Sequence, residues 1–559
     1  MKVTKEMKEA LESKDKSLYD LFDQLLPLYW KNENEVPENV KNILAINKWI
    51  NCVHACNDLA YHILVSRKYQ REAQKKLTHE ISFHEYLSSS YPSFDKPKAN
   101  LELQWAGKCS FTSTGYYPAK CKEIYGVETD GWMNKVYWGD NLQVMLHLLK
   151  DFRGKIDLIY IDPPFDSKSD YKKTISLRGR KSKLINSSFE ETQYGDIWTN
   201  EEYLQFIYER LILCRELLSD TGSIYLHCDW HKSHYLRAVM DEVFGYSHFI
   251  NEVIWYYRRW NIKSTSFASN HDSLLLFSKG KKHIYNQMYI SKSEKSSAKG
   301  KSWKSVIGED GRRRSIQTNE PTKGVPMPDV WDISMINPIA KERVEVNYPT
   351  QKPEALLERI IKASSNPGDL VFDCFMGSGT TQVVAMKLGR RFIGADISKG
   401  AIQTTTKRLL KCAEDLKNNT DRTYYTGIEV YNVNDYSFNP PMFKNDSVVN
   451  VEIVTENHIR GKTLKITHFY PTHLLQKLNL NIEDVVDWRE LVDSIFIDWN
   501  YNGVTFCPEI KDIPDIKSLV YGSYLIPPKA TLIYIKITDL LNESWENTLY
   551  LSNKEDREY

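Results

Sequence analysis

Several short apolar runs in this 559-residue sequence end abruptly in an aspartate, and segments with helical spacing separate them. The clearest run is Leu158–Ile161, which is followed directly by Asp162 and two prolines. Four consecutive apolar residues of this kind predict a buried strand. Strands that alternate with helices predict a parallel sheet covered on both faces, and ligands bind at the carboxyl edge of such a sheet. We therefore expect an α/β fold with Asp162 at its ligand-binding edge.

The residues after this strand suit a planar ring that carries an amino group. Pro163 and Pro164 have no backbone N–H, which leaves the carbonyl of Pro163 free to accept a hydrogen bond. Phe165 offers a flat apolar face beside that carbonyl. A carboxylate, a carbonyl and an aromatic face could together hold such a ring. The alternative is an ordinary strand that runs into a proline turn, which the Asp-Pro pair alone would favour.

A second strand, Asp369–Asp373, runs into a glycine turn that contains Phe375, Gly377, Gly379 and Thr380. A helix follows this turn directly. The combination of strand, glycine turn and helix cradles a nucleotide-like ligand, because glycines permit close backbone approach and the helix N-terminus offers free N–H groups. Neither the lysine of a P-loop nor the third glycine of a dinucleotide-binding turn follows, so a pyrophosphate is not expected here.

Two further strands end in acids. Arg391–Asp396 follows the glycine turn, and an acid at its end can bind two ribose hydroxyls. We therefore expect adenosine joined to something other than a diphosphate. Val136–Trp138 precedes Asp140, which is also at a carboxyl end; the alternative for Asp140 is the N-cap of the helix expected over Leu142–Lys150.

Basic residues gather between the two motifs. Residues 168–183 carry seven Lys or Arg and one acid, and residues 255–304 carry eleven Lys or Arg, two acids and seven Trp or Tyr. Interleaved basic and aromatic residues are typical of a surface that binds phosphates and stacks on bases, whereas the alternatives are a solvated loop and a disordered insertion. The expected DNA contacts are Lys172, Lys173, Arg178, Arg258, Arg259, Arg312, Arg313 and Arg314.

The composition is that of a globular protein without a strong global charge. The net charge is +1, so nucleic-acid affinity has to come from local basic segments. The N-terminus has no apolar signal segment and 18 apolar residues never run together, so we expect a cytoplasmic protein without a membrane span. Nine scattered cysteines favour reduced thiols, and the Cys52/Cys56 pair is better explained by a helix face than by zinc; no metal is expected.

Taken together, the motifs resemble those of β-class DNA amino-methyltransferases, in which a D-P-P-[YF] motif precedes an F-x-G-x-G motif. Here these motifs are Asp162–Phe165 and Phe375–Gly379, and further matches are Gly139–Asp140, Tyr348–Pro353 and Asp396. The basic insertion stands in the place of a target-recognition region. Size and terminal regions resemble the modification subunit of type III restriction–modification systems. Two departures are Cys374, where proline is commoner, and Phe165, where tyrosine is commoner.

The resemblance implies a Rossmann-like methyltransferase sheet, S-adenosylmethionine as cofactor and duplex DNA as partner, with a homodimer and a restriction (helicase/nuclease) subunit left open. It implies that the target base is extruded and that aspartate at the head of the motif favours N6-adenine over N4-cytosine. Methylation of RNA or protein amino groups and a non-catalytic DNA-binding subunit are the rivals. The implied catalytic residues are Asp162, Pro163, Pro164 and Phe165. The implied cofactor-binding residues are Asp140, Gln351, Lys352, Asp373, Phe375, Gly377, Gly379, Thr380 and Asp396.

Five regions are expected from this pattern. Residues 101–108 read as β-like, and a helix is expected over 482–493 between strands at 448–455, 463–469 and 530–537. The regions are a helical N-terminal extension (1–100), the catalytic half of the methyltransferase domain (101–255), an inserted target-recognition region (256–328, with strand 273–277 in the core sheet), the cofactor-binding half (329–417) and a small α+β C-terminal module (418–559).

Overall fold

The chain divides into two compact units, and the described residues belong to the larger one, Phe94–Asn434 with Pro440–Tyr559. The structure is a computed structural model. It describes residues 102–109, 119–164, 170–178, 188–195, 199–258, 267–290, 302–318, 324–337, 340–346, 348, 350–417, 423–433, 447–455, 462–515 and 517–551. The expected N-terminal helices, the Cys52/Cys56 pair, Phe165 and Arg259 lie outside these residues.

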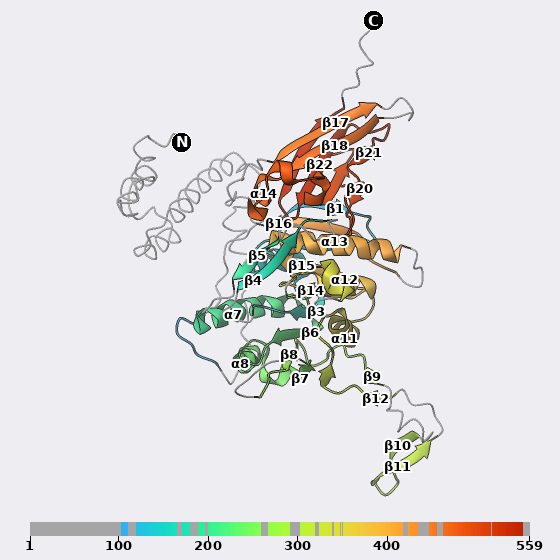
Figure 1. Cartoon of the computed structure of the whole chain (residues 1–559). Helices are drawn as coiled ribbons and strands as arrows, with labels where there is room; N and C mark the ends of the chain where they lie inside the picture. The colour runs from blue at the N-terminus through green and yellow to red at the C-terminus, as the bar shows by residue number, and fades with distance from the viewer. Residues whose placement is uncertain are drawn as a thin grey trace, which may run out of the picture. The chain divides into compact units, whose positions relative to one another are not determined.

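A ten-stranded sheet forms the centre of the described part, as Figure 1 shows. Apolar strand runs bounded by turns build it, as the sequence pattern predicts. Its strand order is β1 (Ala119–Tyr125), β16 (Ile428–Val433), β2 (Asn134–Trp138), β15 (Arg391–Asp396), β14 (Leu370–Asp373), β3 (Ile156–Ile161), β6 (Leu218–Cys228), β8 (His271–Ser278), β7 (Phe249–Tyr256) and β13 (Val330–Asp332).

The expected parallel sheet is confirmed for its central strands and is wrong for three pairs. The strands from β16 to β6 run parallel to their neighbours. By contrast, β8 is antiparallel to both β6 and β7, and β1 is antiparallel to β16. Antiparallel neighbours need no helical crossover, unlike parallel ones; of the residues between β7 and β8, those described (257–258 and 267–270) form no helix.

Helices cover both faces of the sheet, as expected. One face packs against α6 (Asn141–Phe152), α7 (Asn200–Leu217) and α8 (Ser233–Phe244). The other packs against α11 (Glu354–Ser364), α12 (Thr380–Lys387) and α13 (Lys399–Leu416). Successive residues of one strand alternate between the two cores: Ile159 and Ile161 enter the first, and Leu158 and Tyr160 the second. The sheet is therefore a doubly covered, Rossmann-like platform whose carboxyl edge is left open for a site.

Smaller elements are attached to this platform. They are three two-stranded pairings, β4 (Asp170–Ser176) with β5 (Ser188–Gly195), β9 (Tyr289–Ile290) with β12 (Val325–Pro326) and β10 (Ser302–Ile307) with β11 (Arg313–Thr318), together with η3 (Tyr246–His248) and α10 (Lys341–Val346). The run expected to be a basic loop at 168–183 therefore contributes a strand, β4, to a hairpin.

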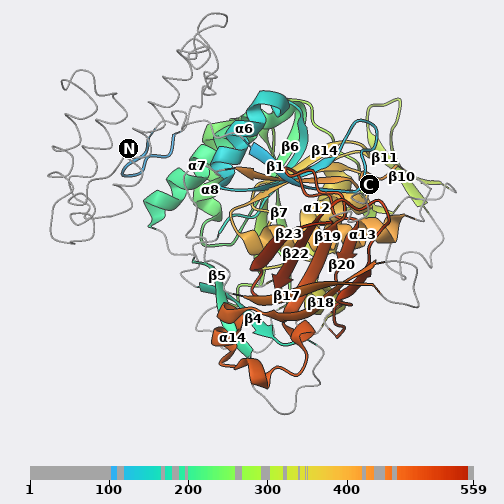
Figure 2. The ribbon, with the colours of Figure 1, turned by 90° about the horizontal axis from the view of Figure 1, so that it is seen from above.

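The C-terminal module consists of two small sheets around a common apolar core, seen in orange and red in Figure 2. Their order is β17 (Val448–Thr455), β18 (Lys462–Tyr470) and β21 (Ser523–Leu525), and β20 (Ile510–Asp512), β19 (Val492–Asp498), β22 (Leu532–Asp539) and β23 (Ser544–Tyr550). A short helix, α14 (Thr472–Leu478), completes it together with η4 (Ile482–Asp484) and η5 (Trp488–Leu491).

Three expectations for these regions are wrong. Residues 102–109 contain one turn and no strand; Glu242 accepts from the Leu103 amide and pairs with the Lys108 ammonium. The helix expected at 482–493 is replaced by η4, η5 and the start of β19, whose apolar residues enter the module core. Finally, β16 joins the large sheet beside β2, so that sheet extends beyond residue 417, where we expected it to end.

An ion-pair cluster joins the module to the platform. Asp493 in the module accepts from Arg178, directly after β4 (2.6 Å), and also pairs with Lys407 on α13. These three side chains are only 12–17% exposed. Arg178 also donates to the backbone carbonyls of Pro514 and Asp515. The cluster thus ties the hairpin that follows the Asp-Pro-Pro motif to the module.

Replacing Asp493 by alanine is expected to destabilise the protein by about 2–4 kcal/mol, because two largely buried cations lose their partner. The thermal unfolding midpoint would measure this loss. Asp515→Ala is the matched control: its carboxylate pairs with Lys411 but is 75% exposed, so a change within about 0.5 kcal/mol is expected. Equal midpoints for the Asp493→Ala and Asp515→Ala variants would contradict a structural role for the cluster.

Candidate active site

A cavity of about 540 Å³ opens at the carboxyl ends of β2, β15, β14 and β3. The parallel strands bring their terminal acids to one edge of the sheet, which is why residues far apart in sequence meet there. Most of the residues predicted for the site line it, namely Asp140, Asp162, Pro163, Pro164, Lys352, Asp373, Phe375, Gly377, Thr380 and Asp396. Tyr160, Asn141, Phe206, Tyr348 and Ser398 complete much of the remaining wall.

Asp162 follows β3 and lies at the edge of this cavity. Its Oδ2 is paired with Lys352, which comes from the segment before α11, 190 residues further along the chain. Its Oδ1 is buried and has no hydrogen-bond partner among the described residues. One oxygen of the carboxylate is therefore held by a cation, and the other can still accept. Lys352, which was expected among the cofactor-binding residues, therefore contacts the acid of the proposed catalytic motif.

Asp140 is the N-cap of α6, which was the alternative from the sequence, and it also lines the cavity. Its Oδ1 caps α6 by accepting from the Leu142 amide at 2.9 Å, and its Oδ2 pairs with Arg210 at 3.3 Å. Burial lowers the pKa of Arg210, although the charge of Asp140 opposes this. The Asp140 side chain is 36% exposed and lines the cavity, so capping the helix leaves it accessible to a ligand.

The glycine turn adopts the left-handed backbone that its sequence predicts. Gly377 and Gly379 have φ of +52° and +74°. A Cβ on Gly379 would stand 2.4 Å from the Thr405 side chain on α13, so a larger residue would be excluded by space as well as by φ. The Asp396 carboxylate accepts from the Gly377 amide and the Ser398 amide, each at 2.8 Å. The turn is therefore shaped by backbone contacts to the acid of the next strand.

Asp373 is fully buried beneath the turn. Burial raises the pKa of its carboxyl to about 7, although hydrogen bonds from the Thr381 hydroxyl (2.6 Å) and the Phe375 amide (2.9 Å) oppose this. Burial likewise raises the pKa of Asp396, against the opposing backbone hydrogen bonds. These acids line or underlie a cavity in which added positive charge would be favourable.

A stability measurement can test the raised pKa of Asp373. Since the folded-state pKa lies above the ordinary value of 3.8, stability from this group is complete below about pH 4 and is lost as pH rises to about 7. The resulting decrease in the free energy of unfolding is at most about 4 kcal/mol. Asp373→Asn should remove it, so the variant should gain stability relative to the wild type between pH 4 and pH 7. A constant difference in unfolding midpoint across this range would contradict the raised pKa.

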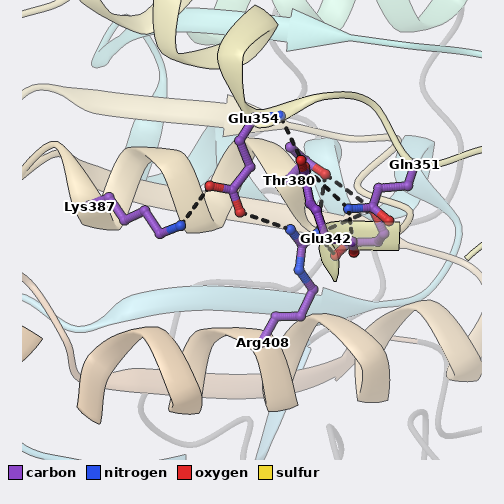
Figure 3. A network of polar contacts seen from close by, with 7 residues as sticks. Glu342, Gln351, Glu354, Thr380, Lys387 and Arg408 are labelled. Carbon is purple, nitrogen blue, oxygen red and sulfur yellow. Dashed lines mark hydrogen bonds and ion pairs between the residues drawn. The ribbon is translucent and has the colours of Figure 1, made fainter. Parts of the chain in front are cut away.

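An ion network that sequence reasoning missed supports the turn from outside, as Figure 3 shows. Arg408 on α13 donates to the Ser378 carbonyl at 2.7 Å and the Thr380 hydroxyl at 3.1 Å, and it pairs with Glu354 at the start of α11. Burial lowers the pKa of Arg408, and the charge of Glu354 opposes this. Gln351, expected at the cofactor, instead points into this network, where its amide donates to Glu342.

A buried row of polar side chains behind Asp162 was also missed. His227 on β6 is fully buried, with Nδ1 3.4 Å from Asp162 Oδ1 and Nε2 3.3 Å from Asp272 Oδ2 on β8. Tyr160 contributes its hydroxyl, 2.8 Å from Nδ1. The only signal in the sequence was a histidine inside an otherwise apolar strand, which is usually a satisfied core residue.

The expected DNA contacts have different environments. The prediction that Arg178 contacts DNA is wrong, because this side chain is buried against the C-terminal module. Burial there lowers the pKa of Arg178 to about 10. Arg258 is exposed. Lys172 and Lys173 lie on β4. The remaining candidates, Arg312, Arg313 and Arg314, are exposed at the tip and second strand of the β10–β11 hairpin.

Two aromatics expected on a stacking surface belong to the core. Trp255 and Tyr257 are each 2% exposed, and Trp255 donates through its indole N–H to the Ile333 carbonyl. Tyr285 and Tyr289, by contrast, are exposed. Strand β7 therefore accounts for part of the aromatic density that the sequence assigned to DNA contact.

The residues around the cavity fit S-adenosylmethionine. The ligand is cationic at sulfur, and its ribose hydroxyls need acceptors; the cavity supplies Asp140, Asp373 and Asp396 at adjacent strand ends. A side chain on Gly379 would displace Thr405 and disturb the turn. Within the described residues, no group of three His, Cys, Asp or Glu side chains could hold a metal, and no helix is long and apolar enough to cross a membrane.

Comparison with known proteins points to the same family that the sequence motifs resemble. Residues 156–407 match the sequence profile described as DNA methylase. The type II methyltransferase M.EcaI of Enterobacter cloacae is 30% identical over 49% of this chain and 69% of its own length. The DNA adenine methyltransferase YhdJ of Escherichia coli (strain K12) is 29% identical over 45% and 76%, respectively.

The name of a third relative refers to a type III restriction-modification enzyme. The Mod subunit of the type III restriction-modification enzyme StyLTI of Salmonella typhimurium is 26% identical over 45% of this chain and 49% of its own length, so the similarity covers about half of each protein. The profile match and the similarity to M.EcaI agree with the order of the motifs and with the residues that line the cavity. This chain therefore belongs to the DNA methylase family of S-adenosylmethionine-dependent DNA methyltransferases.

Proposed function

We propose that the protein transfers the methyl group of S-adenosylmethionine to the N6 amino group of adenine in duplex DNA, in the cytoplasm. The observation that carries the proposal is the Asp162 carboxylate at the edge of the acidic cavity, with Oδ2 held by Lys352 and Oδ1 without a hydrogen bond among the described residues. The choice of adenine rests on aspartate at the head of the motif, and the similarity to YhdJ, a DNA adenine methyltransferase, supports it.

The catalytic residues would act mainly by positioning. The extruded adenine donates its amino hydrogens to Asp162 and to the carbonyl of Pro163, which both line the cavity. These acceptors orient the nitrogen lone pair, and correct orientation is worth up to about 7–11 kcal/mol. Asp162 also stabilises positive charge that develops on the nitrogen. Lys352 holds Oδ2 of Asp162, so that Oδ1 is the oxygen that can accept from the adenine.

The acids of neighbouring strands would hold the methyl donor. When bound, S-adenosylmethionine supplies an electrophilic methyl group. We assign Asp396 to its ribose hydroxyls and Asp140 to its adenine amine, while Phe375, Gly377 and Thr380 provide the wall of the turn. Asp373 lies below, and Arg408 fixes the turn from behind. Phe165 is assigned to stacking on the target base from its place in the motif.

The type III relative supports a place in a restriction–modification system. We propose a restriction subunit as a partner and a homodimer as the assembly, and both rest on that relative and on the chain's length. The recognition sequence depends on the inserted region, for which the structure describes two short strand pairings, β8 and the last residue of β7.

Label transfer from S-adenosylmethionine identifies the product. Purified protein should methylate duplex DNA, and digestion to nucleosides should release N6-methyladenine. N4-methylcytosine would overturn the choice of base. Label in RNA or protein, without label in DNA, would overturn the substrate class, and cofactor binding without transfer to any of these would favour a non-catalytic subunit.

Charge reversal on the β10–β11 hairpin tests its role in DNA binding. Glutamates at Arg312 and Arg313 should weaken binding to duplex DNA and reduce the salt slope by about one for each phosphate that is no longer neutralised. Arg314 is less suitable because it pairs with Asp310. Lys465→Glu on β18 is the matched control, because this exposed lysine lies in the C-terminal module. A salt slope equal to that of the wild type would exclude the hairpin as a phosphate-binding surface.

A further inference from the structure

One buried cation, Arg210, lies behind the wall of the cavity. Its side chain is 5% exposed, and it is the only charged residue among the buried residues of α7. Its neighbours on the helix, Ile207 and Leu211, are apolar and belong to the core on that face of the sheet. Burial of a cation costs free energy, and an apolar side chain would fill this place more cheaply. A cation at such a position therefore points to a use for its contacts.

The guanidinium of Arg210 contacts three residues that line the cavity. Its Nε donates to Asn141 Oδ1 at 2.6 Å, and its Nη2 pairs with Asp140 Oδ2 at 3.3 Å. Its Nη1 donates to the Phe206 carbonyl at 3.0 Å, and its Cζ lies 3.5 Å from the centroid of the Phe206 ring. Asn141 in turn donates to the carbonyl of Cys374, directly after β14, at 3.0 Å. Arg210 thus joins the starts of the glycine turn and of α6 to α7.

These contacts hold both oxygens of the Asp140 carboxylate. Oδ1 accepts from the Leu142 amide at 2.9 Å, and Oδ2 is held by Arg210. The carboxylate therefore cannot turn about its Cβ–Cγ bond without losing a contact. An ionised carboxylate has about four lone-pair positions, so it can still accept from a ligand. The Asp140 side chain is accessible for this, because it lines the cavity. Supporting contacts of this kind set the direction in which a binding group points.

We propose that Arg210 is a positioning residue for the adenine of S-adenosylmethionine, because it orients the Asp140 carboxylate towards the exocyclic amine of that base. This inference rests on the proposed function, in which Asp140 accepts from the amine. Phe206 and Phe375, whose ring centroids lie 6.0 Å apart, supply apolar walls that suit any purine. The aromatic walls therefore contribute general affinity, whereas Arg210 contributes selectivity for a purine that carries the amine.

Calorimetric titration with two ligands tests this assignment. The ligands are S-adenosylhomocysteine and its purine analogue, in which hydrogen replaces the exocyclic amine. The wild type should bind the ligand with the amine about 10–100-fold more tightly, as expected for a hydrogen bond to a charged acceptor. Arg210→Met should reduce this ratio of affinities by at least about fivefold, because Asp140 loses the contact that fixes Oδ2. A general loosening of the cavity would weaken both ligands and leave the ratio unchanged.

Three further variants serve as controls. Arg215→Met changes an arginine on the same helix that is 24% exposed, and it should leave both affinities unchanged. Phe206→Leu should weaken both ligands by similar factors, so that the ratio stays within about twofold of the wild-type ratio. In an Asp140→Asn background, the addition of Arg210→Met should change the ratio by less than about twofold, because the two residues act through one contact.

An Arg210→Met ratio equal to or above that of the wild type would overturn the assignment. If circular dichroism shows that Arg210→Met does not fold, Arg210→Lys decides the question, because one ammonium cannot hold Asn141 and Asp140 together. Its ratio should also fall, and a ratio equal to that of the wild type would again overturn the assignment. A wild-type ratio near one would remove Asp140 from the amine and the inference with it. Absence of N6-methyladenine from the products would instead overturn the proposed function.

Discussion

Asp162→Asn should lower the single-turnover rate of methyl transfer by at least about 10³-fold while S-adenosylmethionine still binds. Asparagine keeps the shape of the side chain but loses the negative charge that stabilises a cationic nitrogen. It also cannot accept the proton that leaves N6. Because Asp162 meets the cavity from β3 and the expected ribose contact comes from β15, the cofactor site should remain intact.

Transfer of labelled methyl groups, combined with calorimetric titration of the cofactor, measures both halves of this prediction. Asp157→Asn is the matched control, since it lies at the opposite end of the same strand, where it accepts from the Leu370 amide. Its transfer rate should stay within a few-fold of the wild type. Turnover of Asp162→Asn at the wild-type rate would exclude Asp162 as the catalytic acid, whatever the product.

The second large effect, on the binding of S-adenosylmethionine, is expected when Asp396 is replaced. Asp396→Ala should weaken S-adenosylmethionine binding by about 100-fold or more, equivalent to about 2.7 kcal/mol. The variant loses the acceptor proposed for the ribose and also leaves the Gly377 and Ser398 amides without their carboxylate. A hydrogen bond to a charged group is worth about 1.5–3 kcal/mol, so the loss of one such bond accounts for most of the effect.

Titration calorimetry gives the affinity, and DNA binding measured without cofactor serves as the internal control. Asp396→Asn helps to separate loss of the ribose contact from loss of the contacts to the Gly377 and Ser398 amides, because asparagine preserves the side-chain volume and part of the hydrogen bonding. It should bind the cofactor less tightly than the wild type and more tightly than Asp396→Ala. A dissociation constant for Asp396→Ala within threefold of the wild-type value would show that this acid does not contact the ligand.

Local patterns predicted the strands of the platform with small errors at their ends. The apolar run before Asp162 became β3, and the run before Asp396 became β15 with the bounds expected. Such segments are predictable because their periodicity and flanking turn residues act within a few positions of the chain. The helix expected at 482–493 was wrong, since its apolar residues do not share one buried face: Val492 enters the core of the C-terminal module, whereas Val485 and Leu491 pack in a separate cluster and Val486 is exposed.

The charged residues were harder to place from sequence. Arg178 occupied a basic run that suggested DNA contact, yet it is buried beside Asp493, 315 residues away. Lys352 was expected at the cofactor and pairs with Asp162. Arg408 had no motif around it, although it holds the glycine turn. Long charged side chains choose their partners in space, and a local pattern contains no information about those partners.

By itself, the sequence determined the doubly covered α/β sheet, the acids at its carboxyl edge and the order of the two motifs. These follow from strand periodicity, proline and glycine chemistry, and the rule that parallel strands end at a common edge. Only the tertiary structure decided that Lys352 holds Asp162, that His227 and Asp272 stand behind it, and that Arg178 serves the C-terminal module. Sheet register and packing bring these groups together, and both depend on contacts between distant segments of the chain.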